Sequence, residues 1–311
     1  MNDKEFALPG YLKIERESLK KRVKIAYELM EDCKICPRNC GVNRLRGEKG
    51  YCRAGLEPEV SSFYCHMGEE PPLSGWAGSG AIFLTHCSLR CVFCQNYPIS
   101  QLGYGKKITI ERLAEIMLIL QKRGCHNINF VTPTHFTPQI LAAIDRAIDG
   151  GLKIPIVYNC GGYEKVETLK LLEGIVDIYL PDIKYGGEEE AKKYSNAQDY
   201  FEVAKKAVKE MYRQVGELKL SPDGIACKGL IIRHLVLPND ISKSEKVLKF
   251  IKEEISSETY VSIMNQYFPA YKALHLNELN RKVKKEEYRK VLNLARRLGL
   301  EKGWKQTVKE V

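Results

Sequence analysis

Two hydrophobic periods alternate along most of the chain. Runs of consecutive apolar residues predict six strands, at 81–85, 127–132, 153–158, 176–180, 230–236 and 259–264. Segments with apolar residues three and four positions apart predict the helices between and after them, at 109–123, 137–149, 164–173, 188–194, 199–215 and 242–255. Apolar strands that alternate with helices are typical of a parallel sheet covered by helices.

The number of strand–helix pairs predicts the shape of this sheet. Six pairs are fewer than the eight of a closed barrel, so we expect an α/β fold with a partial, laterally open (βα)6 TIM-like barrel. An open side leaves room for a large substrate. In such folds the chemistry lies at the C-terminal ends of the strands.

Other segments flank the expected barrel. A helical pattern at 15–31 precedes a cysteine-rich stretch, and Pro and Gly residues in 57–80 predict irregular structure there. We therefore expect a small N-terminal cysteine-rich module at 1–76, the barrel at 77–270 and a basic amphipathic helical extension at 271–311. Within the barrel, Thr137 is expected to cap its helix, and Ser242 and Glu245 to form a capping box.

Composition and charge narrow the class of protein. The 311 residues include no run of about 18 apolar positions, so we expect no membrane span. Met1–Glu5 lack the basic flank and apolar core of a secretion signal, which favours a cytoplasmic protein. The net charge of +10 is concentrated in the stretch from Lys272 to Val311, where 12 Lys and Arg residues stand against 5 acidic ones. A solvated basic helix face explains this excess, and a docking face for an acidic protein or RNA is the alternative.

The eleven cysteines carry the clearest chemical signal. In a reducing compartment, clustered thiols more often bind metals than form disulfides. Cys87, Cys91 and Cys94 follow the first predicted strand at the spacing C-x3-C-x2-C. This loop predicts a 4Fe-4S cluster on three thiolates, with the fourth iron open to another ligand.

A second cysteine set precedes the barrel. Its members, Cys33, Cys36, Cys40 and Cys52, have the spacing C-x2-C-x3-C-x11-C. Four thiolates suit either a closed tetrahedral zinc site or a second iron-sulfur cluster. The spacing lacks the second C-x2-C pair of a zinc ribbon, and both alternatives stay open.

Polar residues follow the other predicted strands. If the strands are parallel, these residues meet at the same mouth as the cysteine loop. They are Thr132-Pro133-Thr134-His135, Asn159-Cys160-Gly161-Gly162, Pro181-Asp182-Ile183-Lys184, Arg233-His234 and Asn265-Gln266.

The cysteine loop, with Phe93 directly before its last cysteine, resembles the defining motif of the radical S-adenosylmethionine (SAM) enzymes. Within that superfamily the chain is similar to the pyruvate formate-lyase activating enzymes, and to an activating-enzyme-like branch of unsettled function. The segments that resemble this branch are 33–44, 66–72, 91–97, 178–182 and 233–238.

The resemblance implies a cofactor set and a reaction. Cys87, Cys91 and Cys94 would bind three irons, and SAM would chelate the fourth. One electron from the reduced cluster would then cleave SAM to a 5′-deoxyadenosyl radical, which abstracts hydrogen from a protein or peptide substrate. A reductant such as flavodoxin or ferredoxin is implied.

The resemblance also implies SAM or substrate contacts by motif position. The loop after the second strand departs from the family's usual Gly-Gly-Glu, which puts its side-chain role in doubt. The candidate residues are Phe93, Thr132, Thr134, His135, Asn159, Asp182, Lys184 and His234.

Two alternative functions remain at this point. One is another radical SAM reaction, such as methylation, epimerisation or cross-linking of a peptide or small molecule. The other is a non-enzymatic zinc or iron-sulfur module that binds RNA, although we consider a nucleic-acid partner the weaker hypothesis. RNA binding would predict an affinity that falls steeply with salt.

Overall fold

The computed structural model describes residues 8–306, so Met1–Glu5 lie outside the described part. The strands are β1 (Glu59–His66), β2 (Ser79–Leu84), β3 (Lys106–Lys107), β4 (Ile128–Val131), β5 (Ile156–Cys160), β6 (Ile178–Pro181), β7 (Lys219–Leu220), β8 (Ala226–Leu235) and β9 (Tyr260–Met264). The α-helices are α1 (Arg16–Glu28), α2 (Pro71–Ser74), α3 (Tyr97–Ser100), α4 (Ile110–Lys122), α5 (Thr137–Asp149), α6 (Val166–Leu171), α7 (Glu188–Ser195), α8 (Tyr200–Val215), α9 (Ser244–Phe250) and α10 (Lys285–Arg297). Short helical turns are η1 (Gly10–Leu12), η2 (Arg44–Arg46), η3 (Thr134–Phe136), η4 (Pro238–Asp240), the π-helical η5 (Ile251–Ile255) and η6 (Tyr271–His275).

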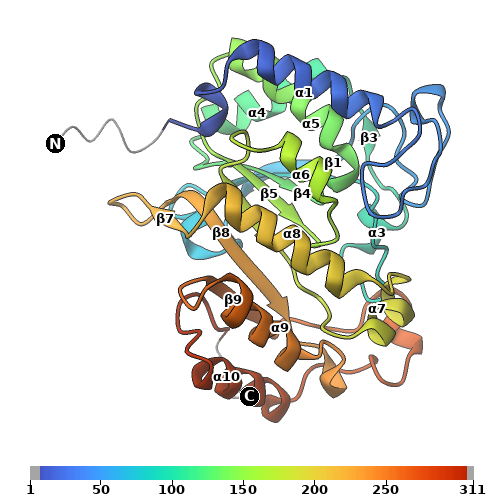
Figure 1. Cartoon of the computed structure of the whole chain (residues 1–311), viewed down its shortest axis with the longest axis vertical. Helices are drawn as coiled ribbons and strands as arrows, with labels where there is room; N and C mark the ends of the chain where they lie inside the picture. Colours follow the sequence, from blue (N-terminus) through green and yellow to red (C-terminus); the bar gives the residue numbers. More distant parts are fainter. Residues whose placement is uncertain (1–7, 307–311) are drawn as a thin grey trace.

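One nine-stranded sheet organises the chain (Figure 1). Its order is β3-β1-β2-β4-β5-β6-β8-β7, with β9 also paired to β8. The neighbours β2, β4, β5, β6, β8 and β9 are parallel throughout. This run confirms the expected α/β fold with six parallel strands in an open sheet.

The prediction of irregular structure across 57–80 was wrong for its first half. Residues Glu59–His66 form β1, which pairs antiparallel with β2. The strand forms because it alternates: Phe63 and Cys65 pack against the main core, while Tyr64, 42% exposed, lies on the opposite face. Pro58 precedes the strand, and the other Pro and Gly residues of 57–80 follow it.

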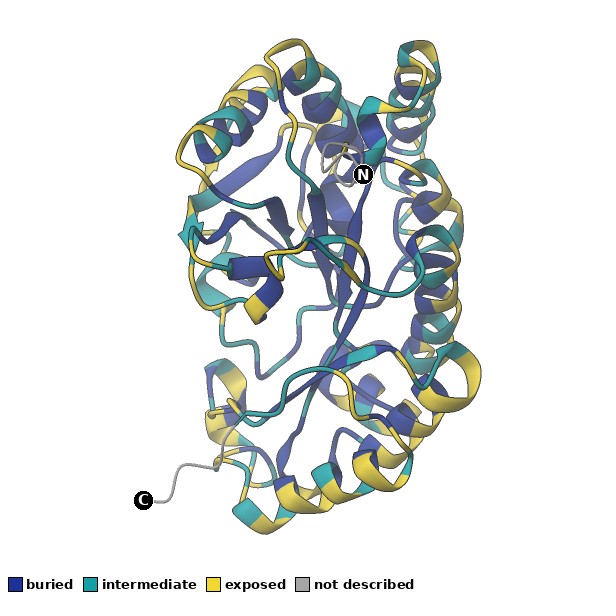
Figure 2. Cartoon of the chain, turned by 90° about the vertical axis from the view of Figure 1, so that its left-hand side faces the viewer, coloured by how far each residue is buried: buried dark blue, intermediate teal, exposed yellow. Residues whose placement is uncertain are grey.

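The two faces of the sheet differ. On the outer face, buried residues such as Ile82, Phe130 and Tyr158 belong to the main core, which α4 and α5 cover and α1 extends (Figures 1 and 2). On the inner face, Leu73 of α2 joins a small apolar cluster with residues of β5, β6 and β8. The inner face beyond that cluster, toward the strand C-termini, is where polar side chains gather.

Two predicted helix starts were also wrong. Thr137 is the first residue of α5, not its cap, and its hydroxyl donates to the Thr134 carbonyl at 3.0 Å. The Ser242 hydroxyl instead bridges the end of β8, accepting from Leu237 N and donating to the Leu235 carbonyl, both at 2.8 Å. The expected capping box is therefore absent at the start of α9.

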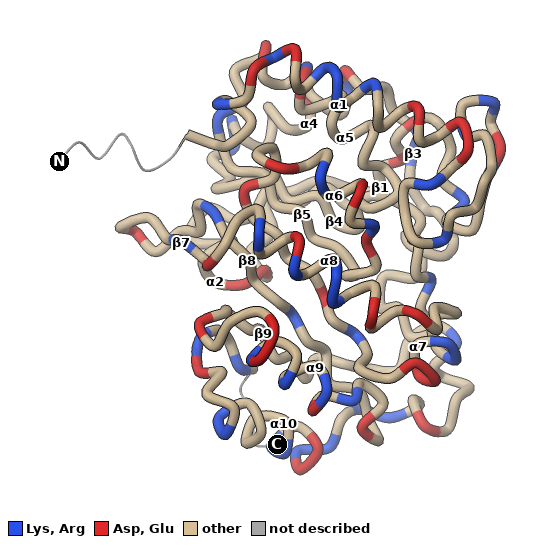
Figure 3. The backbone as a smooth tube through the Cα atoms, viewed as in Figure 1, with Lys and Arg blue, Asp and Glu red and all other residues tan. Residues whose placement is uncertain are grey.

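The basic α10 is amphipathic. Its Tyr288, Val291 and Ala295 are buried, and the Tyr288 hydroxyl donates to the Ile263 carbonyl of β9 at 2.8 Å. Arg289, Lys290, Arg296 and Arg297 are exposed. Figure 3 marks the Lys and Arg positions of α10 in blue. Among the described helices, none has the length and apolar content to cross a membrane.

Candidate functional site

The cysteine loop lies at the C-terminal end of β2. Leu84 ends the strand, α3 begins at Tyr97, and the three cysteines lie on the connection between them. His86 and Arg90 adopt left-handed backbone angles, with φ of 67° and 54°, which turn the chain sharply on either side of Cys87. Leu89, 1% exposed, anchors this turn in the core.

Each cysteine sulfur has a polar neighbour. The Leu89 backbone N–H donates to Cys87 Sγ at 3.3 Å, and the Ser195 hydroxyl donates to Cys91 Sγ at 3.0 Å. Cys94 Sγ and the Ser100 hydroxyl are 3.1 Å apart. Hydrogen bonds of this kind stabilise thiolates and tune cluster potentials.

Burial opposes ionisation of these thiols. It raises the pKa of Cys87, Cys91 and Cys94, and the charge of a neighbouring thiolate in the same loop raises the pKa of each one further. The Lys184 ammonium acts in the opposite direction on all three. Positive charge is what a buried group of thiolates needs, whether from Lys184 or from bound iron.

These residues fit an iron-sulfur cluster. Three thiols of one short loop lie near each other, each with a polar partner, beside a buried cation. Within residues 8–306, no three His, Cys, Asp or Glu side chains are grouped to hold a metal ion. A 4Fe-4S cluster places its thiolates on separate irons.

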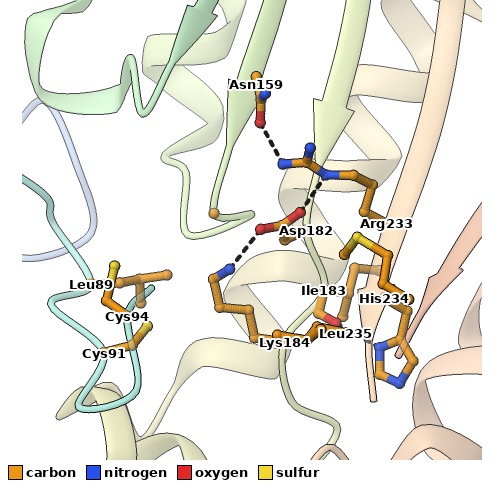
Figure 4. A network of polar contacts seen from close by, with 12 residues as sticks. Leu89, Cys91, Cys94, Asn159, Asp182, Ile183, Lys184, Arg233, His234 and Leu235 are labelled. Carbon is orange, nitrogen blue, oxygen red and sulfur yellow. Dashed lines mark hydrogen bonds and ion pairs between the residues drawn. The ribbon is translucent and has the colours of Figure 1, made fainter. Parts of the chain in front are cut away.

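A charged network faces the loop from the ends of β6 and β8 (Figure 4). The Asp182 carboxylate accepts from Lys184 Nζ at 2.6 Å and from Arg233 Nε at 2.7 Å. Burial would raise the pKa of Asp182, but Arg233 and Lys184 outweigh it and lower that pKa. Burial would likewise lower the pKa of Lys184, but Asp182 and Cys91 raise it. All three groups are therefore charged at neutral pH.

Arg233 extends this network across the mouth. Its guanidinium donates to Asn159 Oδ1 of β5 at 2.5 Å and to Glu69 Oε2 at 3.3 Å. Burial raises the pKa of Glu69 to about 7, although Arg233 opposes the change. The side chains of Asp182, Lys184 and Arg233 keep 16–19% exposure, so they are reachable from solvent.

Two members of this network, Arg233 and Glu69, were not among the predicted SAM or substrate contacts, although Arg233 was expected at the mouth. Arg233 had a signal, because a single Arg in the apolar run 230–237 is costly unless it is paired. Glu69 lies in segment 66–72, which resembles the activating-enzyme-like branch, but nothing in the sequence connected it to Arg233, 164 residues away.

Three predicted contacts lie away from the network. The Thr134 hydroxyl donates to buried Glu164 at 2.6 Å, and His135 Nε2 lies 2.7 Å from the Thr85 carbonyl. His234 points to the opposite side of β8 from Arg233 (Figure 4). Its two ring nitrogens contact the Ile183 carbonyl at 2.7 Å and the Ser244 hydroxyl at 2.9 Å.

Burial explains the protonation of both histidines. It lowers the pKa of His135 to about 3 and that of His234 to about 4, so both rings are neutral. Their described contacts are those of core residues.

The remaining predicted contacts lie near the loop. Phe93, 4% exposed, packs edge-on against Tyr185 and Tyr267, with ring centroids 6.1 Å away in each case. Thr132 directly follows β4 in a left-handed conformation with φ of 62°, and its N–H donates to the Asn159 carbonyl at 2.8 Å. A β-branched residue in that conformation is strained, and such strain clusters at functional sites.

The class of protein is defined by two features together. The sheet is open and mostly parallel, and a three-cysteine loop lies at the C-terminal end of its first parallel strand. The chain belongs to the radical SAM superfamily: the description of that superfamily matches residues 81–225, which run from β2 to the start of β8. Members of this superfamily use a 4Fe-4S cluster and SAM, cleave SAM by radical chemistry and need a reductant.

Two relatives are known from Methanocaldococcus jannaschii. The uncharacterized protein MJ0674 is 34% identical over 309 residues, covering 96% of this chain and 82% of the relative. The uncharacterized protein MJ0808 is 25% identical over 279 residues, covering 79% and 74%.

Two solved structures are similar at low identity. HydG, a maturase of the FeFe-hydrogenase, is 15% identical with a TM-score of 0.49, covering 72% of this chain and 50% of HydG. Methylornithine synthase PylB is 13% identical with a TM-score of 0.46, covering 97% of this chain and 76% of PylB.

Proposed function

We propose that this chain is a radical SAM enzyme whose cluster is held by Cys87, Cys91 and Cys94, and whose substrate is a protein or peptide. The reaction resembles the activation of a glycyl-radical enzyme. The observation that carries the proposal is the position of the three-cysteine loop, which faces the Asp182–Lys184–Arg233 network across the mouth of an open sheet.

The network supports the binding of SAM. The bound cluster supplies one electron that cleaves SAM to methionine and a 5′-deoxyadenosyl radical. Asp182 and Asn159 occupy three of the N–H groups of Lys184 and Arg233, and Glu69 a fourth. The two cations together carry eight N–H groups, so donors remain for the carboxylate of the methionyl group.

The open side of the sheet supports a large substrate. In the sheet order, β1 and β9 lie far apart and do not pair with each other. Tyr64 of β1 stacks on Phe83 of β2, with ring centroids 5.4 Å apart, on the inner face. Tyr64 is 42% exposed and Met67, just beyond β1, is 58% exposed. Exposed apolar side chains along this edge of the sheet suit a peptide segment that binds from the open side.

Isotope transfer tests the substrate class. Protein from the source cells, grown on glycine deuterated at Cα, is mixed anaerobically with reduced enzyme and unlabelled SAM. We expect singly deuterated 5′-deoxyadenosine by mass spectrometry and a glycyl radical signal by electron paramagnetic resonance. The Cys91→Ala variant should give neither.

Fractionation of the labelled extract can contradict the proposed substrate class. The labelled extract is divided by size before the assay, and nucleic acid is removed from the large fraction. Deuterium transfer from the small-molecule fraction alone would contradict a protein or peptide substrate. It would favour a different radical SAM reaction on a metabolite.

A further inference from the structure

A long irregular segment separates α1 from β1. Residues 29–58 contain one regular element, the three-residue turn η2. The small apolar cluster of this segment has three buried members, Met30, Cys33 and Ile35. Irregular segments of this length are uncommon in compact domains, and an apolar cluster this small does not fix one without a covalent or metal staple.

The backbone of this segment folds back on its cysteines. Cys33 N donates to the Val42 carbonyl at 3.0 Å, and Gly41 N donates to the Cys33 carbonyl at 3.2 Å. These two bonds bring the Cys40 end of the loop beside Cys33. The Tyr51 N–H then donates to Cys40 Sγ at 3.3 Å, which brings the neighbouring Cys52 to the same place.

Gly50 shows how tight this arrangement is. A Cβ at that position would lie 2.8 Å from both Cβ and Sγ of Cys40. Real Cβ atoms do not approach other atoms so closely, so only glycine fits beside this thiol.

The four cysteines are free thiols, and three of them are buried. Cys33, Cys36 and Cys52 are each 6% exposed, and no disulfide joins any of the four. A metal that binds the three buried thiols and the half-buried Cys40 together would stabilise this irregular segment.

We propose that Cys33, Cys36, Cys40 and Cys52 form a tetrathiolate metal centre that is separate from the radical SAM cluster. The shared chemistry is four thiolate ligands with no open position. A second iron-sulfur cluster binds its thiolates on separate irons, so it suits cysteines that are not grouped around a single ion within the described residues, whereas a zinc ion requires the four sulfurs to move closer together. The metal centre cross-links the N-terminal module and holds it against the radical SAM loop.

Arg38 connects the N-terminal module to the radical SAM loop. It lies between Cys36 and Cys40, and its Nε donates to the Ser88 carbonyl of the radical SAM loop at 2.9 Å. Its NH2 group donates to the Ser195 carbonyl at 2.8 Å, and the Ser195 hydroxyl donates to Cys91 Sγ. The guanidinium also lies over the Tyr51 ring, 4.0 Å from its centroid. One side chain thus connects the two cysteine sets.

Metal content tests the centre without any catalytic readout. The full chain carrying Cys87→Ala, Cys91→Ala and Cys94→Ala is purified anaerobically, and zinc, iron and acid-labile sulfide are measured. We expect either about one zinc per chain or about four irons with matching sulfide. The first result assigns zinc and the second assigns a cluster, and both support the centre.

A complementary variant keeps the test decisive if that protein folds poorly. Substitution of Cys40 and Cys52 by Ser should remove the same metal and leave the remaining iron unchanged, whereas Cys227→Ala should change nothing. Metal content equal to that of the unmodified chain would overturn the proposal, as would an absence of metal from the triple variant. The proposal rests on the proposed function only for the identity of the other cluster, so a chain that failed to cleave SAM would still give this metal count.

Arg38→Ala tests the connection. In the holoprotein we expect an altered electron paramagnetic resonance spectrum of the reduced radical SAM cluster, with the N-terminal metal retained. Arg46→Ala, an exposed arginine of the same segment, is the control. An unchanged spectrum in Arg38→Ala would overturn the connection.

Discussion

Asp182 is the residue whose charge the site depends on most. Its carboxylate is shared by Lys184 at 2.6 Å and Arg233 at 2.7 Å. Asp182→Asn keeps the size of the side chain and removes its charge. Both cations then remain in a site where their side chains are only 19% and 16% exposed.

The expected loss follows from these distances. Treated as unit charges at an effective dielectric constant of about 20, each pair attracts by roughly 6 kcal/mol before desolvation is subtracted. Breaking a buried pair by removing one partner costs about 3–5 kcal/mol. Arg233 keeps Glu69 and Asn159 as partners, so we expect the lower end, a loss of about 3 kcal/mol in the free energy of unfolding.

Anaerobic denaturant titration at neutral pH measures this loss. Asp199→Asn is the control, because the exposed Asp199 carboxylate accepts only from a neutral tyrosine hydroxyl, at 2.7 Å. The double variant Asp182→Asn, Lys184→Met should lose less than Asp182→Asn alone, because one lone buried cation is gone. A transition midpoint for Asp182→Asn equal to that of the unmodified chain would refute the reasoning.

Three further substitutions probe burial and backbone geometry. Burial raises the pKa of Glu164 to about 7, so its contribution to stability is complete below about pH 4.5 and is lost as the pH rises through 7. As the pH rises from 4.5 to 8, the free energy of unfolding of Glu164→Gln should therefore increase by roughly 3 kcal/mol relative to that of the unmodified chain, as measured by denaturant titration. An equal pH dependence of stability in both proteins would exclude the raised pKa of Glu164. Thr132→Gly should raise the free energy of unfolding by about 0.5–1 kcal/mol by relieving left-handed strain, and a loss of stability would contradict that strain. Gly229 has φ of 128°, and a Cβ there would lie 2.4 Å from Leu218 Cα, so Gly229→Ala should lose about 3 kcal/mol in the free energy of unfolding. Gly224→Ala, where a Cβ would meet no atom within 4 Å, should lose about 1 kcal/mol. Equal losses in the two variants would argue against the clash.

The parallel part of the fold was predictable because its strands are buried on both faces. Such strands appear as unbroken apolar runs, and all six runs became parallel strands. β1 was not predictable, because its inner face carries Ser62, Tyr64 and His66, which no apolar layer buries fully. A half-polar strand beside a Pro and Gly stretch resembles a loop.

The site was predictable only in part, for a geometric reason. Adjacent residues of a strand point to opposite faces, so Arg233 and His234 cannot both face the mouth. Sequence alone does not say which one does, since the pairing of β8 with β6 decides it. The pairing of Asp182 with Arg233 places the arginine inward and sends the histidine into the core. Glu69 reaches the same place through a turn whose sequence carries no periodicity.

Production of 5′-deoxyadenosine tests the central claim most directly. The anaerobically reconstituted chain is reduced with dithionite in the presence of SAM, and the product is measured by liquid chromatography with mass spectrometry. We expect 5′-deoxyadenosine from the unmodified chain and from Cys227→Ala, and none above background from Cys91→Ala. Formation of 5′-deoxyadenosine by Cys91→Ala at the rate of the unmodified chain would contradict the assignment of the cluster to Cys87, Cys91 and Cys94.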